Sequence, residues 1–423
     1  MTSTSPDRRV VITGLGAITP LGLTPDEVFG NLMAGRSGVR ETTRFDTSRC
    51  PVKTSGEVTG FEPAEHGISR RDLRVLDRYQ QYLLAASNAA LADAGLDLPR
   101  NEIVASGKSP HRFERYGAAI GMAFSSTEVL KEQFERLAER GTRAVSPRLF
   151  NQTLVNAGTS LLSVRHGLCG PLVTVSGASA SGSDSVIAAY EKIRYGRAEV
   201  MVAGGAESAV TEIVVSGFAQ NHTGARSGVC RPFDVERDGT VLGEGAAVLV
   251  LEEREHALRR NARVYGEMLG YGLRGDAFDM SDIPPSDAPG MTACLLEALD
   301  DAGVGPEQVG YLNVHGTATK SNDPAEATAI RKVFGPHADD LRVSGIKGAT
   351  GHMLGASGAM ELMTALLATC HDRVPPTYGL RDPDPECDLH HVIGQGVPTP
   401  VEVAVSTSVG MGGNNSAVVV RGA

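Results

Sequence analysis

The stretch TVSGASASGSDSVIAAYEKIRYG, residues Thr174–Gly196, passes from an apolar strand through a bend of small residues into a helix. Three serines, Ser176, Ser179 and Ser181, lie at the bend, and no cysteine does. A side chain at such a bend meets the positive end of the helix dipole and free backbone N–H groups. Both stabilise an anion, so the bend suits a nucleophile or an oxyanion, although serine is also a favoured helix cap.

The rest of the chain alternates apolar strands with helices. We expect strands within residues 10–22, 117–124, 198–208, 245–253, 264–273, 309–319 and 402–420, and helices over 24–35, 72–95, 288–304, 321–335 and the C-terminal part of 341–370. Buried strands that alternate with helices indicate an α/β protein. Polar residues gather at the ends of strands, where α/β folds place their sites.

Bulk composition narrows the class of protein. A chain of 423 residues exceeds one ordinary core, so we expect two domains or two fused halves. The net charge of −10 argues against nucleic-acid binding. No run of about 20 apolar residues predicts a membrane span, and the polar N-terminus resembles no signal peptide. Six scattered cysteines without a CxxC pair predict neither zinc nor disulfides, so we expect no metal and a cytoplasmic location.

Two histidines occur in similar settings. His315 lies in NVHGTAT and His352 in KGATGHMLGASG, each after a strand and each beside glycine, which lets a substrate come close. Lys347 lies between them in the sequence. A single histidine is more often structural than catalytic. Two of them with a lysine and the Ser179 bend, all after strands, predict an active site.

The ordered segments VVITGLGAITPLG, GPLVTVSGASASG, CRPFDVERDGTVLGEGAAVLVLEE, VHGTATKSNDPAEATAI and KGATGHMLGASGAMELM resemble β-ketoacyl-acyl-carrier-protein synthases of the elongating type, in the thiolase superfamily. The resemblance covers nearly the whole chain. It implies a thiolase fold, in which two similar α/β halves form a five-layered αβαβα core. The expected halves are residues 1–260, with the Ser179 bend, and residues 261–423, with both histidines. It also implies an acyltransferase that forms carbon–carbon bonds, works on acyl carrier protein, and forms a homodimer.

The resemblance also assigns residues. Ser179 stands where the family has its nucleophilic cysteine, because Gly177–Gly182 reads GASASG against the family's Thr-Ala-Cys-Ala-Ser-Gly. His315 and His352 match the catalytic histidines, which would stabilise an enolate, and Lys347 matches the family's lysine.

Further positions follow from the same resemblance. The backbone N–H groups of Ser179 and Val409 would hold an oxyanion, and Thr317 and Thr319 would bind the phosphopantetheine arm of the carrier. No other cofactor is implied. Glu326 matches an acidic position that we expect to be structural.

Serine at position 179 leaves three explanations open. A helix dipole can ionise a thiol but not an alcohol, so serine needs a base. The serine is an engineered replacement that traps an acyl group, or the nucleophile of a natural acyltransferase or hydrolase that uses a histidine as base, or a mark of a non-catalytic partner subunit. The last ranks lowest because such chain-length factors usually lose the histidines. Whether the chain pairs with itself or with such a factor stays open.

The pocket also departs from the family pattern. Val409 and Met411 stand where the family carries aromatic gate residues, and the segment 217–228, with Phe218, is unusually polar. These changes predict a substrate other than a plain fatty chain, in polyketide or other specialised metabolism. Asn221, His222 and Arg226 either line this pocket or face solvent. Ring closure within one carrier-bound substrate by an aldol step is a further alternative.

Overall fold

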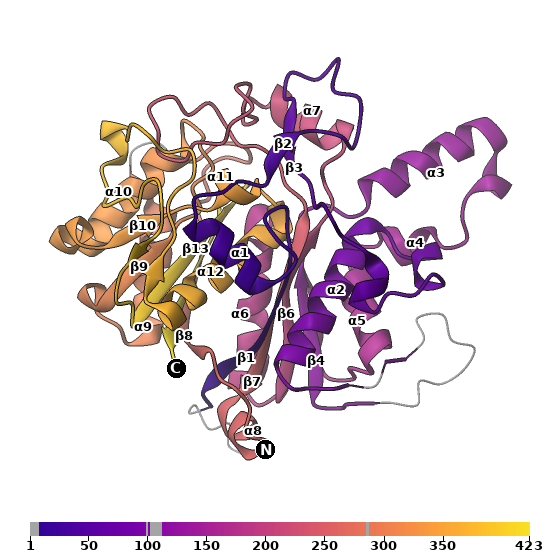
Figure 1. Cartoon of the computed structure of the whole chain (residues 1–423), viewed down its shortest axis with the longest axis horizontal. Coiled ribbons are helices and arrows are strands. Elements are labelled where there is room, and N and C mark those ends of the chain that lie inside the picture. The colour runs from indigo at the N-terminus through magenta and orange to yellow at the C-terminus, as the bar shows by residue number, and fades with distance from the viewer. Residues whose placement is uncertain (1–7, 99, 102–111, 285–286) are drawn as a thin grey trace.

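A computed structural model describes residues 8–98, 100–101, 112–284 and 287–423 (Figure 1). In the N-terminal half, five strands lie in the order β5-β4-β6-β7-β1. Their bounds are β1 (Val10–Ile18), β4 (Tyr116–Gly121), β5 (Leu172–Val175), β6 (Val200–Glu207) and β7 (Gly245–Glu253). The strands β5, β4 and β6 run parallel, whereas β6, β7 and β1 pair antiparallel.

The C-terminal half repeats this arrangement. Its strands lie in the order β10-β9-β13-β14-β8, with bounds β8 (Gly266–Gly275), β9 (Val309–Asn313), β10 (Arg342–Ser344), β13 (Val403–Gly410) and β14 (Asn414–Gly422). The parallel and antiparallel pairings correspond strand by strand to those of the first half. The two five-stranded units join where the start of β1 pairs with β8, so these ten strands are hydrogen-bonded into one continuous sheet.

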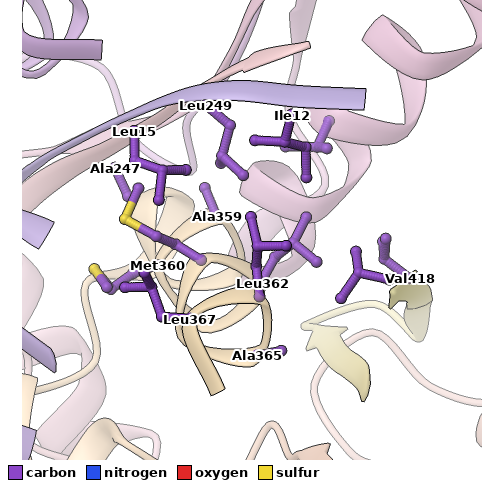
Figure 2. Packing of buried hydrophobic residues seen from close by; sticks show 14 of the residues in the cluster. Ile12, Leu15, Ala247, Leu249, Ala359, Met360, Leu362, Ala365, Leu367 and Val418 are labelled. Carbon is purple, nitrogen blue, oxygen red and sulfur yellow. The ribbon is translucent and has the colours of Figure 1, made fainter. Parts of the chain in front are cut away.

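Two helices fill the space between the halves. The helices α6 (Ser181–Arg194) and α12 (Ser357–His371) contact each other and strands of both units. Figure 2 shows Met360 and Leu362 of α12 packed against Leu15 and Leu249 of the first half, with Val418 of the second half nearby. The almost continuously buried apolar surface of α12 explains this central position.

Outer helices complete the layers. The helices α2 (Arg78–Asp93) and α5 (Ala157–His166) cover the first unit, and α9 (Pro289–Ala302) and α10 (Asn322–Phe334) cover the second. This is the predicted thiolase-like α/β fold with five layers. The remaining elements are α1 (Pro25–Met33), α3 (Thr127–Arg140), α4 (Leu149–Thr153), α7 (Glu212–Gln220), α8 (Arg254–Arg259), α11 (Lys347–Thr350), β2 (Val39–Glu41), β3 (Thr54–Gly56), β11 (Arg373–Val374) and β12 (Val397–Pro398).

Some local expectations were wrong. The helix expected over 72–95 begins only at Arg78, because Asp77 and Gln80 form a capping box there and residues 72–74 make a separate 3₁₀ turn. The first residues of the polar segment 217–228 are the last turn of α7 rather than a loop. In the parts of the chain that the structure describes, no helix is both long and apolar enough to cross a bilayer.

Candidate active site

The bend at Ser179 is a tight elbow between β5 and α6. The chain leaves β5, makes a 3₁₀ turn over Ala178–Ala180 and enters α6. Ala178 has a positive φ of 52°, a left-handed backbone that costs a non-glycine residue energy. Ser181 closes the turn, because its Oγ accepts from the N–H of Gly177 at 2.9 Å. Of the three candidate serines, Ser176 is exposed and Ser181 is buried, so Ser179 alone is left at the site.

His352 faces this elbow from the other half. Its Nε2 lies 2.8 Å from Ser179 Oγ. Its Nδ1 lies 3.0 Å from Ser357 Oγ and 3.3 Å from the backbone nitrogen of Leu354. A backbone N–H only donates, so Nδ1 accepts and the ring proton of the neutral form sits on Nε2. His352 therefore points an N–H donor at Ser179.

The neutral ring of His315 also carries its proton on Nε2, but for a different reason. Lys347 Nζ lies 3.1 Å from His315 Nδ1, and an ammonium group has donors only, so the ring proton again sits on Nε2. The two imidazole rings meet edge to face with centroids 5.6 Å apart. Burial, reinforced by the charge of Lys347, holds the pKa of both His315 and His352 well below the ordinary value, so both rings are neutral donors.

Buried charges hold this arrangement. Lys347 is fully buried, pairs with Glu361 and also donates to the carbonyl of His315. Burial raises the pKa of Glu361 to about 7. Glu326 accepts from the N–H groups of His315 at 2.7 Å and Gly316 at 2.9 Å, so it fixes the turn behind His315. That placement matches the structural role expected for Glu326.

One cavity unites the predicted residues. Its lining includes Ser179, Phe218, His315, Thr317, Thr319, His352, Val409 and Met411, whereas Lys347 lies buried behind it. It also includes residues that the sequence gave no reason to select: Thr240, Ser281, Asp282 and Ile283. The segment 281–283 has no motif, and only the tertiary structure brings it to the cavity.

The polar side chains of the segment 217–228 divide between two environments. Asn221, His222 and Arg226 are exposed and are not part of the cavity wall. Thr223 and Phe218 line it instead. The turn after Val409 also belongs to the wall, since Gly410, Met411, Gly412 and Gly413 line the cavity between β13 and β14.

The chemistry of the cavity follows from this geometry. One neutral imidazole N–H, that of His352, contacts a hydroxyl at the start of a helix, and the second imidazole, that of His315, lines the same cavity. Preorganised donors of this kind stabilise negative charge that develops on an oxygen atom. Fold and site together thus define a thiolase-like α/β protein with an anion-stabilising site between its halves.

Comparison with known proteins gives the family. The family model "Beta-ketoacyl synthase, N-terminal domain" matches residues 7–257, and "Beta-ketoacyl synthase, C-terminal domain" matches residues 265–381. The chain belongs to the β-ketoacyl synthase family. It is similar to "3-oxoacyl-[acyl-carrier-protein] synthase 2" of Coxiella burnetii, with 38% identity over 98% of each chain, and of Synechocystis sp., with 39% identity over 96% of each chain.

Solved structures show the same likeness. "The ishigamide ketosynthase/chain length factor" has a TM-score of 0.89 and 33% identity, and covers 98% of this chain and 99% of its own. A "type II PKS acyl-carrier protein in complex with its ketosynthase bound to the hexaketide" has a TM-score of 0.86 and 30% identity, with coverage of 98% and 99%.

Proposed function

We propose that the chain is a 3-oxoacyl-carrier-protein synthase that joins carrier-bound acyl thioesters. The observation that carries this proposal is the pair of Nε2–H donors, His315 and His352, which line one cavity together with residue 179. Family membership and the relatives named 3-oxoacyl-acyl-carrier-protein synthase support it.

The reaction has two stages. In the first, the side chain at position 179 attacks an acyl thioester, and the carrier's phosphopantetheine thiol leaves with the proton. In the second, a malonyl thioester loses CO₂, and the electron pair of the broken bond forms an enolate whose oxygen accepts from His315 and His352. The enolate carbon then attacks the acyl group on residue 179, a carbon–carbon bond forms, and the side-chain oxygen or sulfur leaves and takes up a proton.

Other residues have supporting roles in this proposal. The N–H groups of Ser179 and Val409 hold the oxyanion of acyl transfer. Thr317 and Thr319 bind the pantetheine arm, which fits their place on the cavity wall and the 3.1 Å contact between their hydroxyls. Lys347 sets the ring of His315, and no cofactor beyond the carrier's own arm takes part.

Ser179 limits the first stage. Because the N–H of His352 Nε2 donates to Ser179, that nitrogen has no free lone pair with which to remove the serine proton. An unactivated alcohol acylates slowly, and the resulting oxygen ester is a poorer acyl donor to an enolate than a thioester. We therefore favour slow or trapped acylation over a serine acyltransferase or hydrolase that uses His352 as its base.

The experiment is direct. Purified protein with Ser179 and the Ser179→Cys variant are incubated with an acyl carrier protein, and acylation is read by intact-protein mass spectrometry. Malonyl-carrier is then added and the β-keto product is measured. We expect Ser179→Cys to accelerate both stages by orders of magnitude. A faster Ser179 form, or hydrolysis of simple esters by it, would support a genuine serine mechanism. Neither activity in either form would indicate a non-catalytic subunit.

The substrate class is the finer part of the proposal. We assign the chain to polyketide or related specialised metabolism. The neighbour bound to a hexaketide supports this assignment, as does a cavity lined by Thr223, Thr240 and Ser281 in addition to apolar groups. Val409 and Met411 leave room for branched or oxygenated acyl chains, since methionine repacks readily around irregular shapes.

The partners are an acyl carrier protein and, in our proposal, a second copy of the chain. Among the described residues, the strand β5 pairs with β4 alone and leaves a free sheet edge, whereas the opposite edge strand β10 bridges to His391. Leu172 of β5 is exposed, and so are Phe150, Leu154 and Val155 in and after α4, a helix that contacts α5, which in turn contacts β5. A free edge beside such a surface favours pairing between subunits. A chain-length-factor subunit on the same face is the alternative, and mass measurement in solution distinguishes the two.

Two further assignments complete the proposal. We place the boundary between the halves at residue 260, which fits family models that end at 257 and resume at 265. We also place the protein in the cytoplasm. All six cysteines are free, which fits a reducing compartment.

A further inference from the structure

The fold contains the elbow twice. Residues 176–182, SGASASG, follow β5 and lead into α6, and residues 352–358, HMLGASG, follow β10 and α11 and lead into α12. Both pass through a 3₁₀ turn whose first residue has positive φ, 52° at Ala178 and 46° at Leu354. Both end in Ala-Ser-Gly. In this correspondence His352 matches Ser176, and Ser357 matches Ser181.

The two matching serines use their hydroxyls differently. Ser181 closes its own elbow through Gly177 N–H and the carbonyl of Ala178. Ser357 instead reaches outward, and its Oγ lies 3.0 Å from His352 Nδ1. Ser357 is 3% exposed, and within the described residues that contact is the only hydrogen bond of its hydroxyl.

We propose that Ser357 is a positioning residue that sets the ring plane and the tautomer of His352. The backbone of His352 is already fixed, because its N–H donates to the carbonyl of Val241 at 2.7 Å and its carbonyl accepts from Gly243 at 2.8 Å. Rotation of the ring about its own bond is what remains free. The N–H of Leu354 reaches Nδ1 only at 3.3 Å, so the hydroxyl of Ser357 is the closer of the two groups that hold that nitrogen.

The consequence concerns the other side of the ring. With Ser357 and Leu354 both donating to Nδ1, the proton stays on Nε2 and points at Ser179. Without the Ser357 hydroxyl, only the 3.3 Å contact from the N–H of Leu354 opposes a flip of the His352 ring or a change of its tautomer. Either change would replace the N–H donor that faces the substrate by a hydrogen-bond acceptor. An acceptor there would repel an enolate oxygen.

The test reads the ring directly and needs no turnover. The protein is labelled with ¹⁵N-histidine, and the His352 signals are assigned by their loss in His352→Gln. In the unchanged chain we expect His352 Nε2 to carry the proton and Nδ1 to be unprotonated and to accept hydrogen bonds. In Ser357→Ala the Nδ1 signal should move toward that of a free nitrogen or broaden by exchange between tautomers. Ser181→Ala is the matched control, because it removes the corresponding hydroxyl of the other elbow and should leave the His352 signals in place.

A second experiment measures kinetics, and it rests on the proposed function. In a Ser179→Cys background, loss of one hydrogen bond at Ser357 should lower kcat for condensation about five- to tenfold with little change in KM. If Ser357→Ala does not fold, Ser357→Cys supplies a weaker donor and should shift Nδ1 in the same direction. A proton on Nδ1 in the unchanged chain, or Nδ1 signals indifferent to both Ser357 variants, would overturn the proposal. If the His352 signals behave as expected but no condensation is found, the proposed function is contradicted and the positioning role of Ser357 is not.

Discussion

Replacement of Lys347 by methionine tests how the buried ion pair serves the site. The side chains of Lys347 and Glu361 are 0% and 1% exposed, and Glu361 Oε2 has no hydrogen-bond partner among the described residues. Removal of one member of a buried pair typically lowers the free energy of unfolding by about 3–5 kcal/mol, because the other charge stays uncompensated. The pKa of Glu361 is already about 7, so protonation of Glu361 relieves part of that loss. We expect Lys347→Met to lower the free energy of unfolding by about 3 kcal/mol at pH 7.

The pH dependence has a defined sign. A carboxyl whose pKa is raised by folding binds more protons folded than unfolded, so its favourable effect on stability is lost as pH rises through the folded value. Loss of the ammonium at Lys347 raises the pKa of Glu361 further. The destabilisation caused by Lys347→Met should therefore be smaller at pH 6 than at pH 8.

The double variant Lys347→Met/Glu361→Leu is the matched control. It removes both charges, and buried pairs replaced by apolar residues are often neutral in stability. We expect its stability within about 1 kcal/mol of the unchanged protein, the difference being the lost hydrogen bond to the His315 carbonyl. Condensation, measured in a Ser179→Cys background, should stay impaired in both variants because His315 Nδ1 has lost its donor.

Urea unfolding followed by circular dichroism measures the stabilities, and product formation measures the activity. The reasoning would be refuted by a double variant no more stable than Lys347→Met. It would equally be refuted by recovery of activity together with stability, since that result would make Lys347 purely structural.

Three further predictions concern the cavity. In a Ser179→Cys background, His315→Ala and His352→Ala should each lower enolate formation about 10²–10³-fold, measured as CO₂ release, while self-acylation persists; unchanged release in both would exclude the donor roles. In an NMR titration, the rings of His315 and His352 should stay neutral from pH 7.5 to 5.5, because burial lowers their pKa; midpoints near 6.5 would contradict that environment. In the same Ser179→Cys background, Val409→Phe should narrow acceptance toward small or linear acyl groups in a panel of acyl carriers, whereas an unchanged preference for straight saturated chains would indicate ordinary fatty-acid elongation.

Local sequence determined the elements of this protein. Apolar runs bounded by glycine predicted the strands, as at 10–22 and 198–208, because burial on both faces of a sheet demands them. Small residues around Ser179 predicted the elbow, because larger side chains do not fit such a turn. Resemblance to the family predicted the thiolase fold, and it selected Ser179, His315 and His352, which the structure brings together in one cavity.

Only the tertiary structure decided how those residues face one another. The ring orientation of His352 depends on Ser357 and Leu354, which the folding of its own turn brings to the ring, and that of His315 depends on Lys347 of α11. Likewise, Ser281–Ile283 reach the cavity while Asn221 and His222 do not. Backbone preferences act over a few residues and fix the type of each element. The protonation state of a buried ring depends on the particular atoms that folding places against it, here the N–H of Leu354, the hydroxyl of Ser357 and the ammonium group of Lys347.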